Sequence, residues 1–173
     1  MKLLITIFAL LYSSFLLANE CVEGNCVDGY GTYEFSTGKF KGDKYIGENK
    51  NNLSHGLGTY YYANGEIYKG EFLNNIREGW GSNFFKSGDV YHGEFQNNKM
   101  HGTGTYISSE GSKYIGEFSN GDMHGYGIYY YKDGTVYAGE FKNDYFNGDG
   151  ILIEKDGTVI SGTWSEDKLI RRK

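Results

Sequence analysis

Five glutamates that recur every 23 residues are the side chains best suited to acid–base or metal chemistry: Glu48, Glu71, Glu94, Glu117 and Glu140. A carboxylate can act as a general base or bind a hard cation. If each period supplies two strands, consecutive carboxylates lie roughly 9–10 Å apart. Oxygen ligands approach Ca²⁺ to about 2.3–2.6 Å. The glutamates therefore predict a ladder along a sheet and no shared metal site.

Three histidines also share one position of the period: His55, His101 and His124. Other periods hold Glu, Asn or Asp there, which favours a turn or capping role, and the spacing argues against zinc. The chain has no nucleophile elbow, no zinc-protease motif and no phosphate loop. We predict no catalytic residue, no metal and no cofactor. An enzyme of unknown type remains the second alternative to a binding function.

The first 18 residues have the pattern of a secretory signal. Lys2 is followed by an apolar run over residues 3–17 that ends at Ala18. The run is shorter than the roughly 20 residues of a transmembrane helix. Leu16 is bulky where cleavage prefers a small residue, so an uncleaved N-terminal anchor is the alternative. Both interpretations predict an exported protein that is periplasmic, secreted or membrane-anchored on the non-cytoplasmic side.

Two cysteines, Cys21 and Cys26, follow this segment directly. An even cysteine count in an exported chain predicts a disulfide bond. The loop would contain Gly24 and Asn25, which suit a tight turn. A metal or redox pair is the competing interpretation, but a metal site needs two further ligands and the spacing differs from C-x-x-C.

A 23-residue period governs the rest of the sequence. Aromatic or apolar residues mark it at Tyr45, Tyr68, Tyr91, Tyr114, Tyr137 and Ile160. Each is followed at a fixed offset by one glycine, and each of the five tyrosines is then followed by a Gly-x-Gly pair. Such regularity predicts a repeat array in which each unit contacts its neighbours.

One unit reads as a β-hairpin. Residues 68–72 (Tyr-Lys-Gly-Glu-Phe) alternate as a strand does. Asn74 and Asn75 tolerate the positive φ of a tight turn, and residues 79–85 form the second strand. The chain has 27 glycines and no proline, and no helical periodicity interrupts the hairpins. The prediction is an all-β, elongated, twisted single antiparallel meander sheet of about twelve strands.

Aromatic rings are expected to supply the core, because branched aliphatic residues are few. Parity along the strands places rings and glycines on one face, where a bare glycine leaves room for a ring. The pattern breaks at Asn83 and Ser108, where a ring or apolar residue is expected, and the first unit has Asn49 where a ring belongs. The predicted core residues are Tyr45, Tyr68, Phe72, Tyr91, Phe95, Tyr114, Phe118, Tyr137, Phe141 and Trp164.

The motif Tyr-x-Gly-Glu-Phe followed by Gly-x-Gly resembles the MORN (membrane occupation and recognition nexus) repeat. It recurs in register at residues 68–81, 91–104, 114–127 and 137–150. The resemblance implies an elongated antiparallel sheet that binds proteins or organises assemblies, and phospholipid binding has been proposed for some members. The predicted segments are a signal peptide or anchor at 1–18, a disulfide-bearing cap at 19–44, the array at 45–164 and a basic tail at 165–173.

A second periodic series lies beside the glutamates, on the face predicted to be opposite the rings. We call this series the apolar stripe: Tyr61, Phe84, Ile107, Tyr130 and Ile153. An apolar stripe flanked by carboxylates is a candidate binding surface. Alternatively, the stripe completes cross-strand packing while the glutamates stay solvated.

Charge narrows the choice of partners. The chain has 17 Lys and Arg against 22 Asp and Glu, a net charge of −5. This balance disfavours nucleic acid and anionic lipid as general partners. The basic tail carries Lys168, Arg171, Arg172 and Lys173, which either contact a membrane or acidic partner or form a frayed end. We expect a protein partner, with membrane contact through an uncleaved N-terminus or this tail as the alternative.

Overall fold

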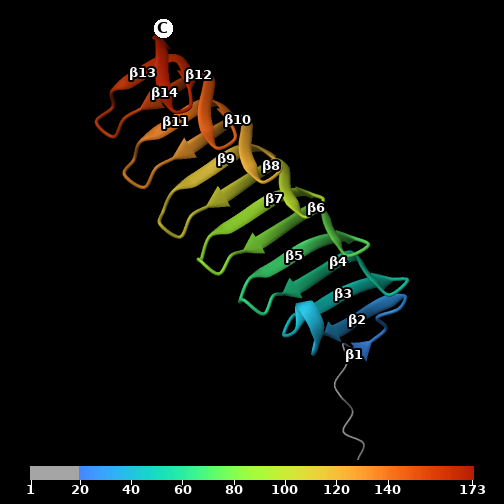
Figure 1. Cartoon of the computed structure of the whole chain (residues 1–173). Helices are drawn as coiled ribbons and strands as arrows, with labels where there is room; N and C mark the ends of the chain where they lie inside the picture. The colour runs from blue at the N-terminus through green and yellow to red at the C-terminus, as the bar shows by residue number, and fades with distance from the viewer. Residues whose placement is uncertain (1–19) are drawn as a thin grey trace, which may run out of the picture.

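A computed structural model describes residues 20–173 as a single antiparallel sheet in which every strand pairs with its sequence neighbours (Figure 1). This confirms the predicted all-β meander. The sheet has 14 strands, two more than the approximate count expected from the sequence. The strands are β1 (Glu20–Gly24), β2 (Gly29–Glu34), β3 (Lys44–Lys50), β4 (Leu53–Tyr61), β5 (Ile67–Leu73), β6 (Ile76–Phe84), β7 (Val90–Gln96), β8 (Lys99–Ile107), β9 (Lys113–Ser119), β10 (Asp122–Tyr130), β11 (Val136–Lys142), β12 (Tyr145–Ile153), β13 (Val159–Ser165) and β14 (Lys168–Arg172).

The two additional strands lie at the ends of the sheet. At one end, β1 pairs with β2, and a disulfide joins Cys21 to Cys26 with their Cα atoms 5.8 Å apart. At the other end, β14 pairs with β13 inside the segment that the sequence suggested as a frayed tail. The Lys173 Nζ atom lies 2.6 Å from a carboxylate oxygen of Asp149. Residues 168–172 are therefore part of the sheet, because their backbone pairs with β13 despite their charged side chains.

The predicted signal peptide or anchor at residues 1–18 lies outside the described residues. Within residues 20–173, no helix has both the length and the apolar character needed to cross a bilayer.

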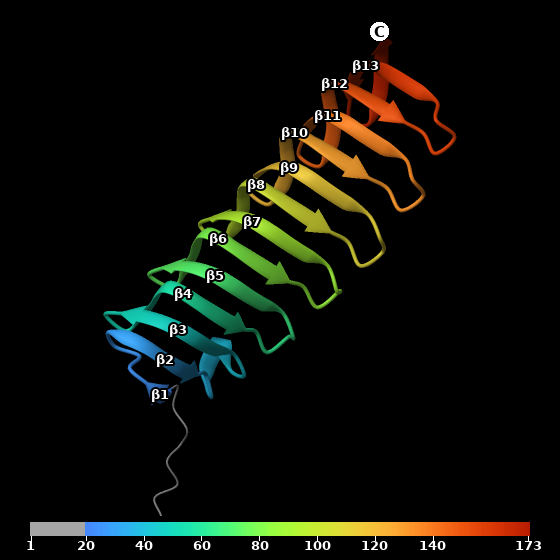
Figure 2. The same cartoon turned by 180° about the vertical axis from the view of Figure 1, so that it is seen from behind.

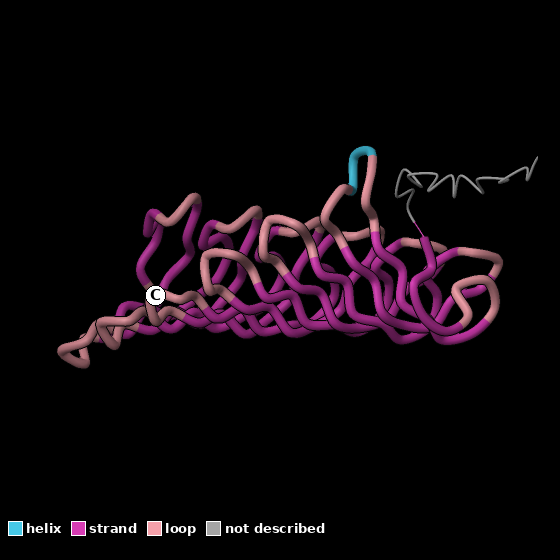
Figure 3. Tube along the Cα trace, turned by 90° about the horizontal axis from the view of Figure 1, so that it is seen from below, coloured by secondary structure: helices cyan, strands magenta, loops and turns pink. Residues whose placement is uncertain are grey.

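The sheet is an elongated, curved trough. Two opposite views show the strands stacked side by side across the long axis (Figures 1 and 2). Seen from below, the strand ends and their turns rise above the floor of the sheet (Figure 3). The short 3₁₀ helix η1 (Gly38–Phe40) rises on the same side. We call this side the concave face and its reverse the convex face.

Tight turns connect the strands within each hairpin and bind the preceding hairpin. Asn74 and Asn75 have φ values of 52° and 67°, as the sequence predicted for a turn of this type. The Asn75 backbone N–H donates to the Ser54 carbonyl at 2.9 Å. The Ser54 backbone N–H donates to Asn75 Oδ1 at 2.7 Å. Each such turn therefore holds two consecutive repeats in register.

A tyrosine ring lying on bare backbone forms the centre of each repeat. Tyr68 is fully buried on the concave face and its hydroxyl donates to the Glu71 carbonyl at 3.0 Å. A Cβ atom added to Gly81 would lie 2.5 Å from the Tyr68 hydroxyl oxygen, and one added to Gly70 would lie 2.5 Å from the Gly81 Cα atom. Only glycine therefore allows the ring to approach the sheet this closely.

Phenylalanines on both sides of each tyrosine join the repeats into one core. Tyr68 lies 5.1 Å from Phe72 of its own repeat and 4.9 Å from Phe95 of the next, measured between ring centroids, in edge-to-face geometry. Such pairs contribute about 0.5–1.5 kcal/mol beyond their buried area. The cluster contains the ten residues assigned to the core from the sequence, together with Phe146, which stacks on Tyr137 at 3.6 Å.

We predict that Gly81→Ala destabilises the sheet by about 1–3 kcal/mol, because the new methyl group overpacks the site beneath Tyr68. Urea unfolding followed by far-UV circular dichroism measures this change. The exposed turn residue Lys86 provides a control, since Lys86→Ala should leave the midpoint nearly unchanged. Equal midpoints for Gly81→Ala and the parent would contradict the ring-on-glycine packing.

The core tyrosines also predict an alkaline limit to stability. Burial raises the pKa of Tyr45 from 10.0 to about 12, against the opposing effect of a hydrogen bond with Ser54, and burial raises the pKa of Tyr68 and Tyr91 as well. The neutral phenol is thus favoured in the folded state. This stabilisation is complete below pH 10 and is lost as the pH rises towards 12.

An alkaline titration should therefore show the tyrosinate absorbance of the buried rings rising only as the β-sheet circular dichroism signal disappears. Full ionisation of all tyrosines with an intact sheet signal would refute the prediction.

Candidate binding surfaces

The glutamate ladder lies on the convex face and caps a bulge in every repeat. The strand register shifts between Gly70 and Phe72. At this bulge, the backbone N–H of Trp80 donates to Glu71 Oε1 at 3.0 Å, and Gly79 adopts a φ of +78°. The same contact joins Glu48 to Leu57, Glu94 to Thr103, Glu117 to Tyr126 and Glu140 to Asp149.

The glutamates are thus not merely solvated, as one interpretation of the sequence held. Backbone and hydroxyl hydrogen bonds from Thr103 hold the pKa of Glu94 below its usual range. Residues 20–173 contain no group of three or more His, Cys, Asp or Glu side chains placed to hold a metal ion. The contacts give the ladder a structural role in supporting the bulges.

The apolar stripe also lies on the convex face and is longer than the sequence indicated. Its members Tyr61, Phe84, Ile107 and Ile153 are 39–41% exposed. Cross-strand pairing places another residue between each pair of stripe members and one beyond Ile153. We call the whole row the convex ladder, which adds Ile67, Val90, Lys113, Val136 and Val159 to the apolar stripe.

The added members of the convex ladder have a sequence signal that was missed. Each directly precedes the residue that marks the 23-residue period. The added position also contains the ladder's one charge, Lys113, whose Nζ atom lies 4.7 Å from the centroid of the Tyr130 ring. The ladder therefore presents an apolar row from β4 to β13, interrupted by a cation that itself contacts a ring.

A second row widens the apolar surface in the C-terminal half. Ile115 pairs with Ile128, and Ala138 pairs with Ile128 and Ile151. The three isoleucines are 36–42% exposed. The corresponding positions on β5 to β8 are polar: Lys69, Ser82, His92 and Thr105. The convex face is therefore most apolar over β9 to β12.

Residues between the paired glycines form a third row that sequence reasoning did not select. Tyr30, Leu57, Trp80 and Tyr126 are 57–65% exposed, the largest values among the bulky apolar side chains of their strands. Their backbone N–H groups are fixed by the glutamates, except at Tyr30, so these side chains project outwards. A shallow hollow lies between Trp80 and Tyr126, with Thr103 and Ile115 in its lining.

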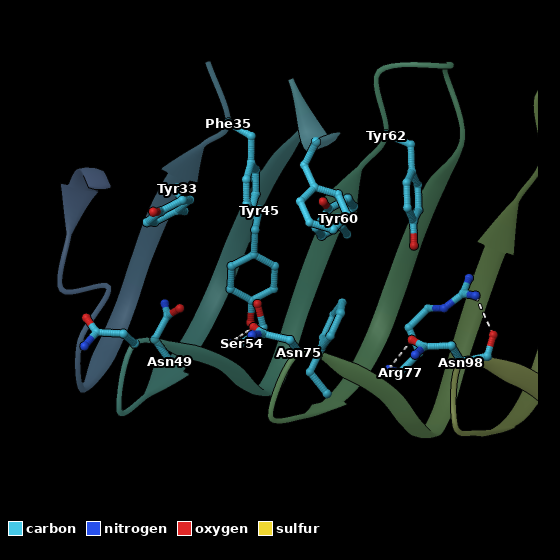
Figure 4. A pocket seen from close by; sticks show the side chains of 13 residues that line it. Tyr33, Phe35, Tyr45, Asn49, Ser54, Tyr60, Tyr62, Asn75, Arg77 and Asn98 are labelled. Carbon is cyan, nitrogen blue, oxygen red and sulfur yellow. Dashed lines mark hydrogen bonds between the residues drawn. The ribbon is translucent and has the colours of Figure 1, made fainter. Parts of the chain in front are cut away.

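The concave face has a pocket of about 490 Å³ near its N-terminal end (Figure 4). Rings from β2 to β5, from the residues that follow β2 and β4, and from η1 line it, and polar side chains line one wall. The lining residues are Tyr33, Phe35, Phe40, Tyr45, Asn49, Asn52, Ser54, Tyr60, Tyr62, Phe72, Asn75, Arg77 and Asn98. We call this cavity the N-terminal pocket. The sequence signalled it only through Asn49, which interrupts a row of rings.

The comparison with protein families agrees with this architecture. A family model described as MORN repeat matches six segments: residues 28–40, 45–67, 68–90, 91–113, 114–136 and 137–159. Among curated proteins, none matches the chain. Among solved structures, the chain is similar to the SAS-4 (dCPAP) TCP domain in complex with a proline-rich motif of Ana2 (dSTIL) of Drosophila melanogaster. The identity is 17%, over 95% of this chain and 98% of that chain, with a TM-score of 0.46.

The bulge contact predicts unequal effects of two substitutions at Glu71. Glu71→Ala removes the acceptor for the Trp80 N–H and should cost about 1 kcal/mol in the free energy of unfolding. Glu71→Gln retains an acceptor oxygen and should cost less. Urea unfolding compares both with Glu110→Ala, a substitution in an exposed turn. If the two Glu71 variants matched the Glu110 control, the carboxylate would not support the bulge.

Proposed function

The chain belongs to the MORN-repeat family, and from this premise we propose that it is an exported, non-catalytic protein that binds a protein partner through its convex face. MORN repeats commonly mediate binding to proteins or membranes. The proposed function is therefore that of a docking or scaffolding surface with no cofactor. The convex ladder is the observation that carries this proposal.

The convex ladder suits a protein partner because it is apolar, ordered and long. Its residues recur at the same place in successive strands, so their side chains form one row across ten strands. Contiguous exposed apolar surface of this kind marks interaction sites. The glutamate ladder lies on the same face, which supplies polar groups beside an apolar centre.

Membrane association is the runner-up function. An uncleaved N-terminal segment or the basic residues Lys168, Arg171 and Arg172 would supply the contact. The five carboxylates of the glutamate ladder lie beside the apolar surface, and carboxylates oppose approach to an anionic leaflet. This placement favours protein over lipid as the partner of the convex face.

Two further observations support the exported, non-catalytic character. The Cys21–Cys26 pair lies at disulfide distance, which fits an oxidising compartment. The tyrosine, glycine and glutamate positions recur from repeat to repeat, whereas catalysis needs unlike groups brought to one centre. An enzyme of unknown type therefore remains the second alternative.

We predict that changing Tyr61, Phe84 and Tyr130 together to Ser removes the partner from an affinity pull-down with the intact exported protein. These residues lie on the outer face and are at least partly exposed, so the sheet should remain folded by circular dichroism. A matched variant with Leu57, Trp80 and Tyr126 changed to Ser alters an equal number of convex residues in another row. It should retain the partner if the convex ladder is the contact.

If the folded variant with Tyr61, Phe84 and Tyr130 changed to Ser retained the same partners, the convex ladder would be excluded as the contact surface.

Vesicle flotation distinguishes membrane association from protein binding. If the full chain floated and residues 19–173 did not, the membrane contact would lie in the N-terminal segment. Flotation of residues 19–173 with anionic vesicles would favour the lipid function over the protein-binding one.

A further inference from the structure

The N-terminal pocket lies on the concave face, opposite the convex ladder. Its volume of about 490 Å³ falls within the roughly 300–1,000 Å³ typical of small-molecule sites. Tyr45, Tyr60, Tyr62 and Phe72 supply apolar surface, and Phe40 of the η1 loop lines the pocket as well. Figure 4 shows the rings of Tyr60 and Tyr62 above a row of polar side chains that includes Asn75 and Arg77.

The pocket exists because this repeat lacks a ring. Asn49 occupies the position that holds Phe72, Phe95, Phe118, Phe141 and Trp164 in the following repeats. Those rings pack edge-to-face against the tyrosines of the core. Asn49 is shorter and its amide donates to the Gly47 carbonyl at 3.0 Å, so the wall of the pocket is polar and lacks a ring at this position.

A guanidinium group lies at the edge of this space. Arg77 occupies the position that holds Met100, Met123 and Phe146 in later repeats. Its Cζ atom lies 5.4 Å from the Tyr68 ring centroid and 5.3 Å from that of Phe95. Among residues 20–173, ion pairs form at Lys44–Glu34 and Lys173–Asp149, and Arg77 has no carboxylate partner.

Arg77 also retains hydrogen-bonding capacity. Its terminal nitrogens donate to Asn83 Oδ1 and to the Asn98 carbonyl, whereas its Nε–H is buried without a partner in the described chain. A guanidinium has five N–H donors in a planar fork that matches a carboxylate. A purely structural Arg77–Asn83 pair would explain neither the missing ring at Asn49 nor the unpaired donors.

The lining side chains favour an anion at this end of the trough. The 13 lining residues include no Asp or Glu, and the nearby Asp43 carboxylate accepts from the Tyr60 hydroxyl at 2.6 Å. Asn75 and Asn98 use their Oδ1 atoms to accept backbone N–H groups, which leaves their Nδ2 donors. At the corresponding turn positions near the C-terminal end, Asp144 and Asp167 present carboxylates instead.

We propose that the N-terminal pocket binds an organic carboxylate that carries an aromatic or apolar body. The carboxylate pairs with Arg77 and with the amide donors of Asn75 and Asn98. The body lies in the cavity against the partly exposed rings of Tyr60 and Tyr62. This site is separate from the convex ladder and does not depend on the protein partner proposed for that face.

The test uses the ¹⁵N-labelled full chain with N-acetyl-phenylalanine and N-acetyl-phenylalaninamide as probes. The two probes differ only in the carboxylate. We expect the acid to shift the Arg77 Nε–H resonance and to bind at least tenfold more tightly than the amide. Equal binding of the two probes, or no binding of either, would overturn the proposal.

Two variants restore the pattern of the neighbouring repeats. Arg77→Met combined with Asn83→Tyr should fold, because both residues occur at these positions elsewhere in the sheet, and should lose the preference for the acid. Asn49→Phe should fill the pocket and lose binding of both probes. The convex variant Tyr126→Ser is the matched control and should bind as the parent does. Retention of the acid preference by the double variant would contradict the role of Arg77.

A second pair of probes separates the sources of such a carboxylate. The peptide Ala-Ala-Ala-Phe with a free C-terminus represents a chain end, and its amidated form is the control. Tighter binding of the free peptide than of N-acetyl-phenylalanine supports recognition of a peptide terminus, and the reverse order supports a free acid. These readouts need no protein partner, so loss of the pull-down leaves them unaffected.

Discussion

Close contact between a tyrosine ring and two glycines is the constraint on which the sheet depends. Tyr68 reaches full burial in a single-layer sheet only because Gly70 and Gly81 have no side chains beneath it. The flanking phenylalanines then cover the ring edges and connect one repeat to the next. A second layer is therefore not needed to bury the core. The two broad faces can carry side chains of different chemistry from each other.

The side-chain chemistry differs between the two faces and changes along the length of the sheet. The convex face carries glutamates that hold the bulges and an apolar ladder that widens towards the C-terminal half. The concave face is aromatic throughout but takes polar residues near its N-terminal end, where Asn49, Ser54, Arg77 and Asn83 replace apolar neighbours. Because each repeat keeps the same backbone, such local replacements change the surface without changing the fold.

The periodic tyrosines and glycines were sufficient to predict the meander, the turns and the core, because the same local pattern recurs in successive repeats. The bulge contact of Glu71 could not be predicted, since it depends on a register shift that brings the Trp80 N–H to the carboxylate. Ile67 and Val90 were missed because their place in the convex ladder depends on cross-strand pairing. β14 was missed because charged side chains obscured a backbone able to pair. The N-terminal pocket could not be predicted, because only the folded structure shows that Asn49 and Arg77 line the same cavity.

The direction of the strands has a mechanical consequence. The hydrogen bonds between strands run along the long axis of the ribbon, and β1 and β14 lie at its opposite ends (Figure 1). Tension between those ends would peel the strands apart one pair at a time instead of shearing many bonds together. Each released hairpin would add roughly 75–80 Å of extended chain. A protein of this shape would yield stepwise under load and act as an extensible tether between whatever it joins.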